Sequence, residues 1–198
     1  MLRILAIGVT LAIIAVVGLA ASQPDTFLVE RALRMKAPPE RVFPLISDFS
    51  NWAAWSPWVA KDPQIEITLS EHTSGMGARY EWAGDDNVGR GRMEVVRVTP
   101  PHSVRLQLSI FEPMLATNMV DFVLTPFGDY TKVIWSMRGP LDFKMKLMSV
   151  FTSMDQWVGP DLARGLERLK ALAEQPDAAG GESVDGSPLS MVLAPGTR

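Results

Sequence analysis

The segment that most constrains the fold is residues 143–174, near the C-terminus. Its second half places leucines three and four residues apart, which lines one face of a helix: Leu162, Leu166, Leu169 and Leu172. Charged residues fall between these leucines and suit the solvent-facing side. Such a helix needs an apolar partner to bury its face, and the strands that precede it are the candidate. The sequence therefore predicts a sheet packed against this helix.

The first half of the same segment continues the apolar surface with methionine and aromatic residues in place of leucine. Gly159 and Pro160 separate the two halves. A proline inside a helix removes a backbone hydrogen bond and costs about 3 kcal/mol. We therefore expect either a kink at this point or a new helix with Pro160 in its first turn.

Upstream of this segment, apolar and polar residues alternate in the way that is typical of β-strands. A helix with Pro39 in its first turn is expected after the first strand, followed by a tryptophan-rich turn or short helix. Glycines at 89 and 91 predict a bulge or bend. Short connections between consecutive strands favour an antiparallel meander and the α+β class. The expected strands are 27–36, 64–70, 77–83, 88–98, 104–110, 116–125 and 131–137.

The N-terminus carries a separate apolar run, in which Thr10 is the one polar residue between positions 4 and 21. About 18 helical residues span roughly 27 Å, close to the hydrocarbon thickness of a bilayer. The alternative is a secretory signal peptide cleaved near Ser22. We predict an uncleaved transmembrane signal anchor over residues 1–22, followed by a linker over 23–26. Arg3 before the run and acidic residues after it predict a single-pass membrane protein with its domain on the outer, periplasmic or extracellular, side.

Composition excludes several classes of function. The net charge of -3, without a basic stripe, argues against nucleic-acid binding. The absence of cysteine excludes disulfides, cysteine nucleophiles and thiolate metal sites. The two histidines, His72 and His102, lie in predicted turns without carboxylates at ligand spacing. We therefore expect no metal and no cofactor.

Four local phrases, together with the order of the elements, resemble the polyketide cyclase/dehydratase-like branch of the START/SRPBCC superfamily over residues 27–174. The phrases are Ala37-Pro38-Pro39-Glu40-Arg41-Val42-Phe43, Trp52-x-x-Trp55-Ser56-Pro57-Trp58, Val88-Gly89-Arg90-Gly91-Arg92-Met93-Glu94 and Gly165-Leu166-Glu167-Arg168-Leu169-Lys170. The resemblance implies an α+β helix-grip fold, in which a curved antiparallel sheet wraps around a long C-terminal helix. It also implies a deep hydrophobic cavity between sheet and helix. It implies no particular reaction, because members include lipid carriers, hormone sensors and cyclases.

Aromatic and methionine side chains give the strongest functional signal, because they exceed what a minimal core needs and methionine adapts to varied ligands. In the fold that the resemblance implies, we expect them to line a ligand cavity. The set is Trp52, Trp55, Tyr80, Trp82, Met93, Phe122, Trp135, Met137, Met148, Phe151 and Trp157. Residues 175–198 are rich in Gly, Ala, Ser and Pro and predict a disordered tail.

Asp155 is the candidate catalytic residue, because it sits among apolar residues where burial would raise the pKa of its carboxyl. The alternative is a first-turn carboxylate in a helix whose capping box is formed by Ser153 and Gln156. Polar residues on strands are also open to two interpretations, because a one-residue register shift reverses which face they occupy. These are Tyr80, Glu94, Asn118 and Asp121.

Three functions are compatible with the sequence. The favoured one is a membrane-anchored domain that binds a hydrophobic small molecule or lipid in its cavity, rather than an enzyme. The second is an enzyme of the polyketide cyclase/dehydratase type that uses Asp155 as a general acid or base. The third is a protein-interaction module at the cell envelope, with Trp52, Trp55 and Trp58 as exposed anchors.

Overall fold

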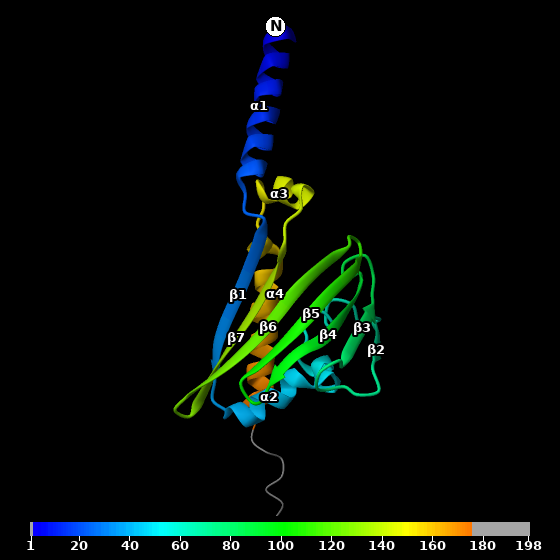
Figure 1. The fold of residues 1–198 in the computed structure, drawn as a ribbon, viewed down its shortest axis with the longest axis vertical. Helices are drawn as coiled ribbons and strands as arrows, with labels where there is room; N and C mark the ends of the chain where they lie inside the picture. Colours follow the sequence, from blue (N-terminus) through cyan, green and yellow to red (C-terminus); the bar gives the residue numbers. More distant parts are fainter. Residues whose placement is uncertain (1, 176–198) are drawn as a thin grey trace, which may run out of the picture.

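The computed structural model describes residues 2–175, so the predicted tail beyond Gln175 lies outside the described residues. Seven strands form one antiparallel sheet in the order β1-β7-β6-β5-β4-β3-β2 (Figure 1). The strands are β1 (Thr26–Met35), β2 (Glu66–Leu69), β3 (Arg79–Ala83), β4 (Arg90–Thr99), β5 (Ser103–Glu112), β6 (Ala116–Phe127) and β7 (Tyr130–Pro140). The helices are α1 (Leu2–Ser22), α2 (Pro39–Ser47), the 3₁₀ helix η1 (Phe49–Ala54), α3 (Phe143–Ser149) and α4 (Met154–Ala173).

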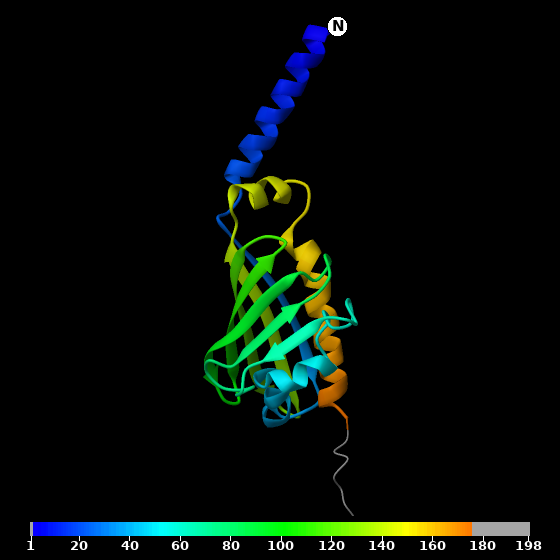
Figure 2. The same cartoon turned by 90° about the vertical axis from the view of Figure 1, so that its right-hand side faces the viewer.

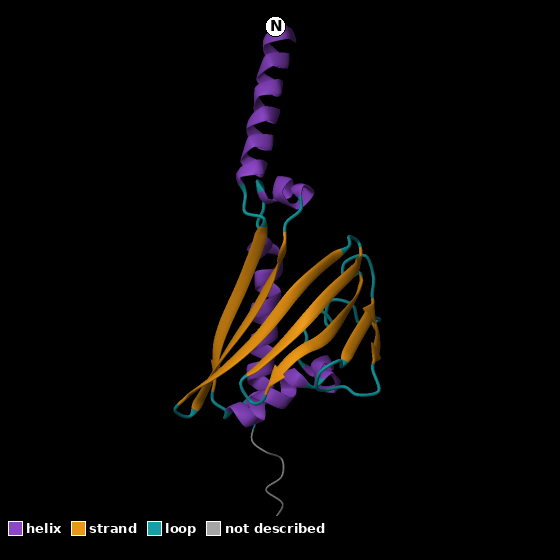
Figure 3. Ribbon diagram, viewed as in Figure 1, coloured by secondary structure: helices purple, strands orange, loops and turns teal. Residues whose placement is uncertain are grey.

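The sheet curves around α4, which packs against β1 and β7 (Figures 2 and 3). The leucine face predicted from the sequence makes this contact, since Leu162, Leu166 and Leu169 are fully buried. Every neighbouring pair of strands is antiparallel, and β4 carries register irregularities beside Gly91 and between Val95 and Arg97. The predicted meander and the helix-grip α+β class are confirmed.

Of the two alternatives predicted at Gly159 and Pro160, a new helix with Pro160 in its first turn is wrong, because α4 begins at Met154 and runs through Pro160. The break between α3 and α4 lies before Ser153, which caps α4 by accepting a hydrogen bond from the Gln156 backbone at 3.2 Å. Gln156 Oε1 accepts from the Ser153 backbone in return, at 3.1 Å. This reciprocal capping box sets the helix start, because it satisfies two backbone donors that the first turn leaves free.

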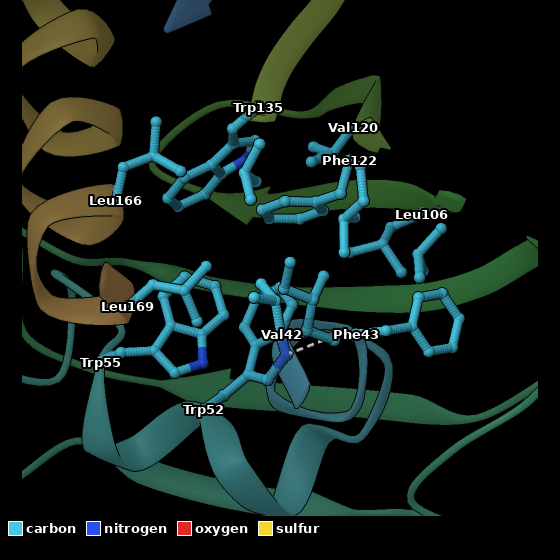
Figure 4. Packing of buried hydrophobic residues seen from close by; sticks show 14 of the residues in the cluster. Val42, Phe43, Trp52, Trp55, Leu106, Val120, Phe122, Trp135, Leu166 and Leu169 are labelled. Carbon is cyan, nitrogen blue, oxygen red and sulfur yellow. Dashed lines mark hydrogen bonds between the residues drawn. The ribbon is translucent and has the colours of Figure 1, made fainter. Parts of the chain in front are cut away.

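The centre of the domain is a cluster of aromatic rings between α4, η1 and the sheet (Figure 4). Trp52 and Trp55 are buried in it, and their indole nitrogens donate to the carbonyl oxygens of Ile46 and Leu45, each at 2.9 Å. Trp58 is half-buried. The prediction of three exposed tryptophan anchors is therefore wrong, because η1 and the segment that follows it turn these rings toward the sheet.

Helix α1 stands clear of the domain and keeps its apolar side chains exposed (Figure 1). It is long enough and apolar enough to span a membrane, properties that a signal sequence shares. Residues 23–25 join it to β1, and its base contacts α3.

Candidate functional site

A cavity of about 210 Å³ lies between α4, the inner face of the sheet and the segment that follows η1. Its walls are mostly apolar, and it reaches the surface beside Glu112 and Pro113, which are exposed. The lining residues are Trp52, Ser56, Trp58, Ile65, Tyr80, Trp82, Val88, Met93, Leu108, Ile110, Glu112, Pro113, Asn118, Met137, Met154, Val158 and Asp161.

The structure places some of the predicted cavity residues at this cavity and others elsewhere. Those that line it are Trp52, Tyr80, Trp82, Met93 and Met137. Three others, Trp55, Phe122 and Trp135, form the solid aromatic core, where their rings pack on one another instead of on an empty volume. The remaining three, Met148, Phe151 and Trp157, are exposed on α3, α4 and the segment between them.

Besides Ser56, two neutral polar groups line the cavity, the amide of Asn118 and the hydroxyl of Tyr80. Both residues are buried, at 5% and 6% exposure, and neither side chain has a hydrogen-bond partner within residues 2–175. Burial raises the pKa of Tyr80 to about 12, so its hydroxyl remains a hydrogen-bond donor at neutral pH. Gly139 makes room for the amide, because a Cβ there would lie 1.8 Å from Asn118 Oδ1.

Register settles the orientation of the polar strand residues. Tyr80 pairs with Met93 and Asn118 with Leu108, and all four side chains turn toward the cavity. Asp121 lies on the other face of β6, where its Oδ1 accepts from Arg105 Nε at 2.5 Å. Glu94 of β4 pairs with Arg79 of β3; it is half-buried and does not line the cavity.

The charged residues that line the cavity are both acidic. Asp161, at 5% exposure, pairs with Lys61 Nζ and Arg164 Nη2, each at 2.5 Å. Glu112 at the mouth pairs with Arg90 at 3.2 Å. Among the described residues that line the cavity, none is a lysine, arginine or histidine. The cavity therefore offers neutral hydrogen-bonding groups and negative charge, and no basic partner for an anion.

The leucine pattern predicts that the charged residues of α4, Asp161 among them, face solvent. For Asp161 this prediction is wrong, because the residue is buried and lines the cavity. A second stripe on α4 carries the missing signal: Met154, Val158 and Asp161 recur at three- and four-residue spacing and all line the cavity. This stripe lies beside the leucine face. The helix therefore turns one face to the core and a neighbouring face to the cavity.

Asp155 lies outside the cavity and forms a bidentate ion pair with Arg31 of β1, with oxygen–nitrogen distances of 2.7 and 3.0 Å. The Arg31 guanidinium lowers the pKa of this carboxyl below its ordinary 3.8, so the expectation of a raised pKa is wrong. Gly159 allows the approach, because a Cβ there would lie 2.1 Å from Arg31 Nη2. The alternative interpretation is confirmed: Asp155 is a first-turn carboxylate in a helix that is capped by Ser153 and Gln156.

Replacing Asp155 with asparagine is expected to reduce stability only slightly at neutral pH, since both partners are partly exposed to water. A carboxyl with a lowered pKa in the folded state stabilises it above the unfolded pKa, and the contribution disappears as pH falls through the folded value. The stability difference between wild type and Asp155→Asn should therefore be largest at neutral pH and vanish well below pH 3.8. Urea unfolding across this range measures it, and a difference that grows on acidification would contradict the assignment.

Neither histidine lines the cavity, and both His72 and His102 are exposed. Within residues 2–175, no group of three histidine, cysteine, aspartate or glutamate side chains is arranged to hold a metal ion.

Comparison with known proteins places these features in context. The family model described as "Polyketide cyclase / dehydrase and lipid transport" matches residues 26–174. Protein CV1439 from Chromobacterium violaceum has 17% sequence identity and a TM-score of 0.55, and the match covers 78% of this chain and all (100%) of that one. The major latex-like protein 151 of Panax ginseng has 11% identity and a TM-score of 0.53, over 77% of this chain and 100% of its own. The Aha1 dimer from Colwellia psychrerythraea has 17% identity and a TM-score of 0.55, and the match covers 75% of this chain and 96% of that one. No curated protein sequence matches the chain.

Proposed function

We propose, from the premise that the chain belongs to the polyketide cyclase/dehydrase and lipid transport family, that its domain binds a neutral hydrophobic small molecule or lipid. The observation that carries this proposal is the cavity, whose mostly apolar lining includes the buried Asn118 and Tyr80, two side chains without hydrogen-bond partners within residues 2–175. We also propose that α1 stays attached as a membrane anchor, with the domain on the outer side of the membrane.

Burial of apolar ligand surface supplies the driving force, at about 25 cal/mol per Å². The Asn118 amide and the Tyr80 hydroxyl fix the ligand's orientation, as a few convergent polar groups do in apolar pockets. A ligand carrying a carbonyl or hydroxyl group can hydrogen-bond to these two side chains, which favours an amphiphile over a pure hydrocarbon.

Binding is favoured over catalysis because the carboxylate at the cavity wall already has two cationic partners. Lys61 Nζ engages one oxygen of Asp161 and Arg164 Nη2 engages the other, so this carboxylate is already occupied by partners from the protein itself. Asp155, the candidate acid of the enzyme hypothesis, is paired outside the cavity.

The direct test is native mass spectrometry of the full chain, extracted gently from the membranes of its own host. We expect a co-purifying neutral compound of defined mass with a carbonyl or hydroxyl group. A chain that carries nothing, and takes up nothing when incubated with a total lipid extract, would contradict the proposal.

The charge of the lining predicts a preference for neutral ligands. Decanol should bind about tenfold more tightly than decanoate at neutral pH, because decanoate would lose its hydration without gaining a basic partner. Displacement of the neutral fluorescent probe N-phenyl-1-naphthylamine measures both affinities. Asp161→Asn is the informative variant, because it removes the negative charge that Lys61 and Arg164 neutralise beside the cavity. This variant should reduce the preference for decanol over decanoate. Tighter binding of decanoate by the wild type would contradict the proposed ligand class.

A further inference from the structure

Seven apolar side chains are exposed on two segments at the end of the domain from which α1 emerges (Figures 1 and 2). Leu115 and Phe151 are the most open, at 84% and 77% exposure. We call the set the apolar rim: Phe111, Met114 and Leu115 at the β5–β6 connection, and Phe143, Met148, Phe151 and Trp157 on α3, α4 and the segment between them. Exposed apolar side chains gathered at one end of a domain mark an interaction surface.

The apolar rim borders the mouth of the cavity on two sides. On the β5–β6 connection, Glu112 and Pro113 line the cavity and are enclosed in sequence by rim residues Phe111 and Met114. On α4, Met154 and Val158 also line the cavity, next to the rim residues Phe151 and Trp157. Whatever covers the rim therefore also faces the route into the cavity.

Helix α3 adds nothing to the core of the domain, because none of its residues is buried. An isolated helix of 7 residues is marginal in water, so α3 needs a partner for its apolar side chains. It contacts the base of α1, and Lys146 donates a hydrogen bond to Asp25 in the linker. Short amphipathic helices with aromatic residues and lysine suit the interface between water and lipid, and Lys144 is exposed on α3.

The linker limits how far the apolar rim can lie from the end of α1. Residues 23–25 separate Ser22 from Thr26, a gap that spans less than about 15 Å even when fully extended. If α1 crosses a bilayer, the domain end with the rim is held at the surface of that bilayer. Both rim segments lie at the end of the domain from which α1 emerges, so a tilt about the linker is the motion that would bring both to the headgroups (Figures 1 and 2).

From these observations we propose that the apolar rim docks on the phospholipid bilayer that α1 spans, so that the cavity opens directly to the lipid phase. This inference rests on the anchoring role of α1 in the proposed function. It narrows the ligand class to amphiphiles that partition into the membrane, because such molecules can pass between bilayer and cavity without crossing water.

The opposite end of the sheet supplies a matched control. Phe127, in the β6–β7 hairpin far from α1, is also exposed, at 62%, and lies over the Arg34 guanidinium (Figure 1). It is comparable to Phe151 in residue type and exposure, but the β6–β7 hairpin that carries it lies at the end of the sheet away from α1 (Figure 1).

The chain has no cysteine, so single-cysteine variants can each carry one fluorescent label. The variants are Leu115→Cys, Phe151→Cys, Phe127→Cys and, in the middle of α1, Ile13→Cys. Each full-length protein is labelled with bimane and reconstituted into vesicles of phosphatidylcholine and phosphatidylglycerol. Quenching is then compared between brominated lipid, which reaches labels in the bilayer, and iodide, which reaches labels in water.

We expect the labels at positions 13, 115 and 151 to be quenched by brominated lipid and protected from iodide. The label at position 127 should be quenched by iodide and not by brominated lipid. Lipid quenching at 13 combined with iodide quenching at 115 and 151 would overturn docking and leave the anchor intact. Protection of 115 and 151 from both quenchers would also overturn it, in favour of a protein partner. Iodide quenching at 13 would remove the anchor on which docking rests. Ligand occupancy of the same variants, read by native mass spectrometry, reports on the cavity separately.

Discussion

Replacing Trp135 with alanine is expected to lower the free energy of unfolding by about 3–5 kcal/mol, the range for large aromatic side chains in packed cores. Trp135 is fully buried on β7, where its ring stacks on Phe122 with centroids 4.9 Å apart. It meets Trp55 and Trp58 edge-on at 5.6 and 5.8 Å. Helix α4 packs directly against the indole, because a Cβ at Gly165 would lie 2.6 Å from it. Alanine would leave a void that helix and sheet cannot both close.

Trp135→Phe is the matched control for this prediction. The indole Nε1 of Trp135 is buried and has no hydrogen-bond partner in the described part of the chain. Phenylalanine removes that unpaired donor, which offsets part of the packing it loses. We expect less than half the destabilisation caused by alanine, measured by urea unfolding of the full chain in micelles with near-ultraviolet circular dichroism. Equal losses for the two variants would show that the packing account is wrong.

Replacing Val158 with tryptophan is expected to weaken ligand binding at least about tenfold, a change of about 1.4 kcal/mol. Val158 is half-buried on α4 and lines the cavity, so the added indole would occupy space that a ligand needs. The cavity volume of about 210 Å³ leaves little room for both. Titration with N-phenyl-1-naphthylamine and native mass spectrometry of the co-purifying compound give two independent readings.

Ala171→Trp provides the comparison, because Ala171 is exposed on the same helix and does not line the cavity. It should bind like the wild type, and both variants should keep the wild-type unfolding midpoint within a few degrees. Undiminished binding by a folded Val158→Trp protein would place the ligand elsewhere.

The sheet could be predicted from the sequence because each strand carries its own alternation of inward and outward residues. The start of α4 was harder to predict, because Pro160 and the capping box of Ser153 and Gln156 indicate different positions for it. Pro160 is exposed, so water can satisfy the carbonyl that loses its partner, while the Ser153 and Gln156 capping box fixes the true start of the helix.

The cavity was harder to predict than the fold, because residue type does not separate packed aromatic rings from rings beside an empty volume. Trp82 and Trp135 both lie on strands and face inward, but only Trp82 lines the cavity. The difference depends on where α4 crosses the sheet. The two aspartates of α4 are equally hard to distinguish by residue type. Asp155 pairs with Arg31 outside the cavity, while Asp161 lines the cavity.

The direct connection between α1 and β1 also has a mechanical consequence. β1 lies at the edge of the sheet and pairs with β7 along its whole length, from Thr26 opposite Pro140 to Met35 opposite Thr131. Tension applied through α1 runs along β1, while the hydrogen bonds of an antiparallel pair run across it. The load is therefore shared by all these bonds in shear, instead of opening them one at a time. A connection at this point lets the domain withstand tension applied through α1 without losing its edge strand.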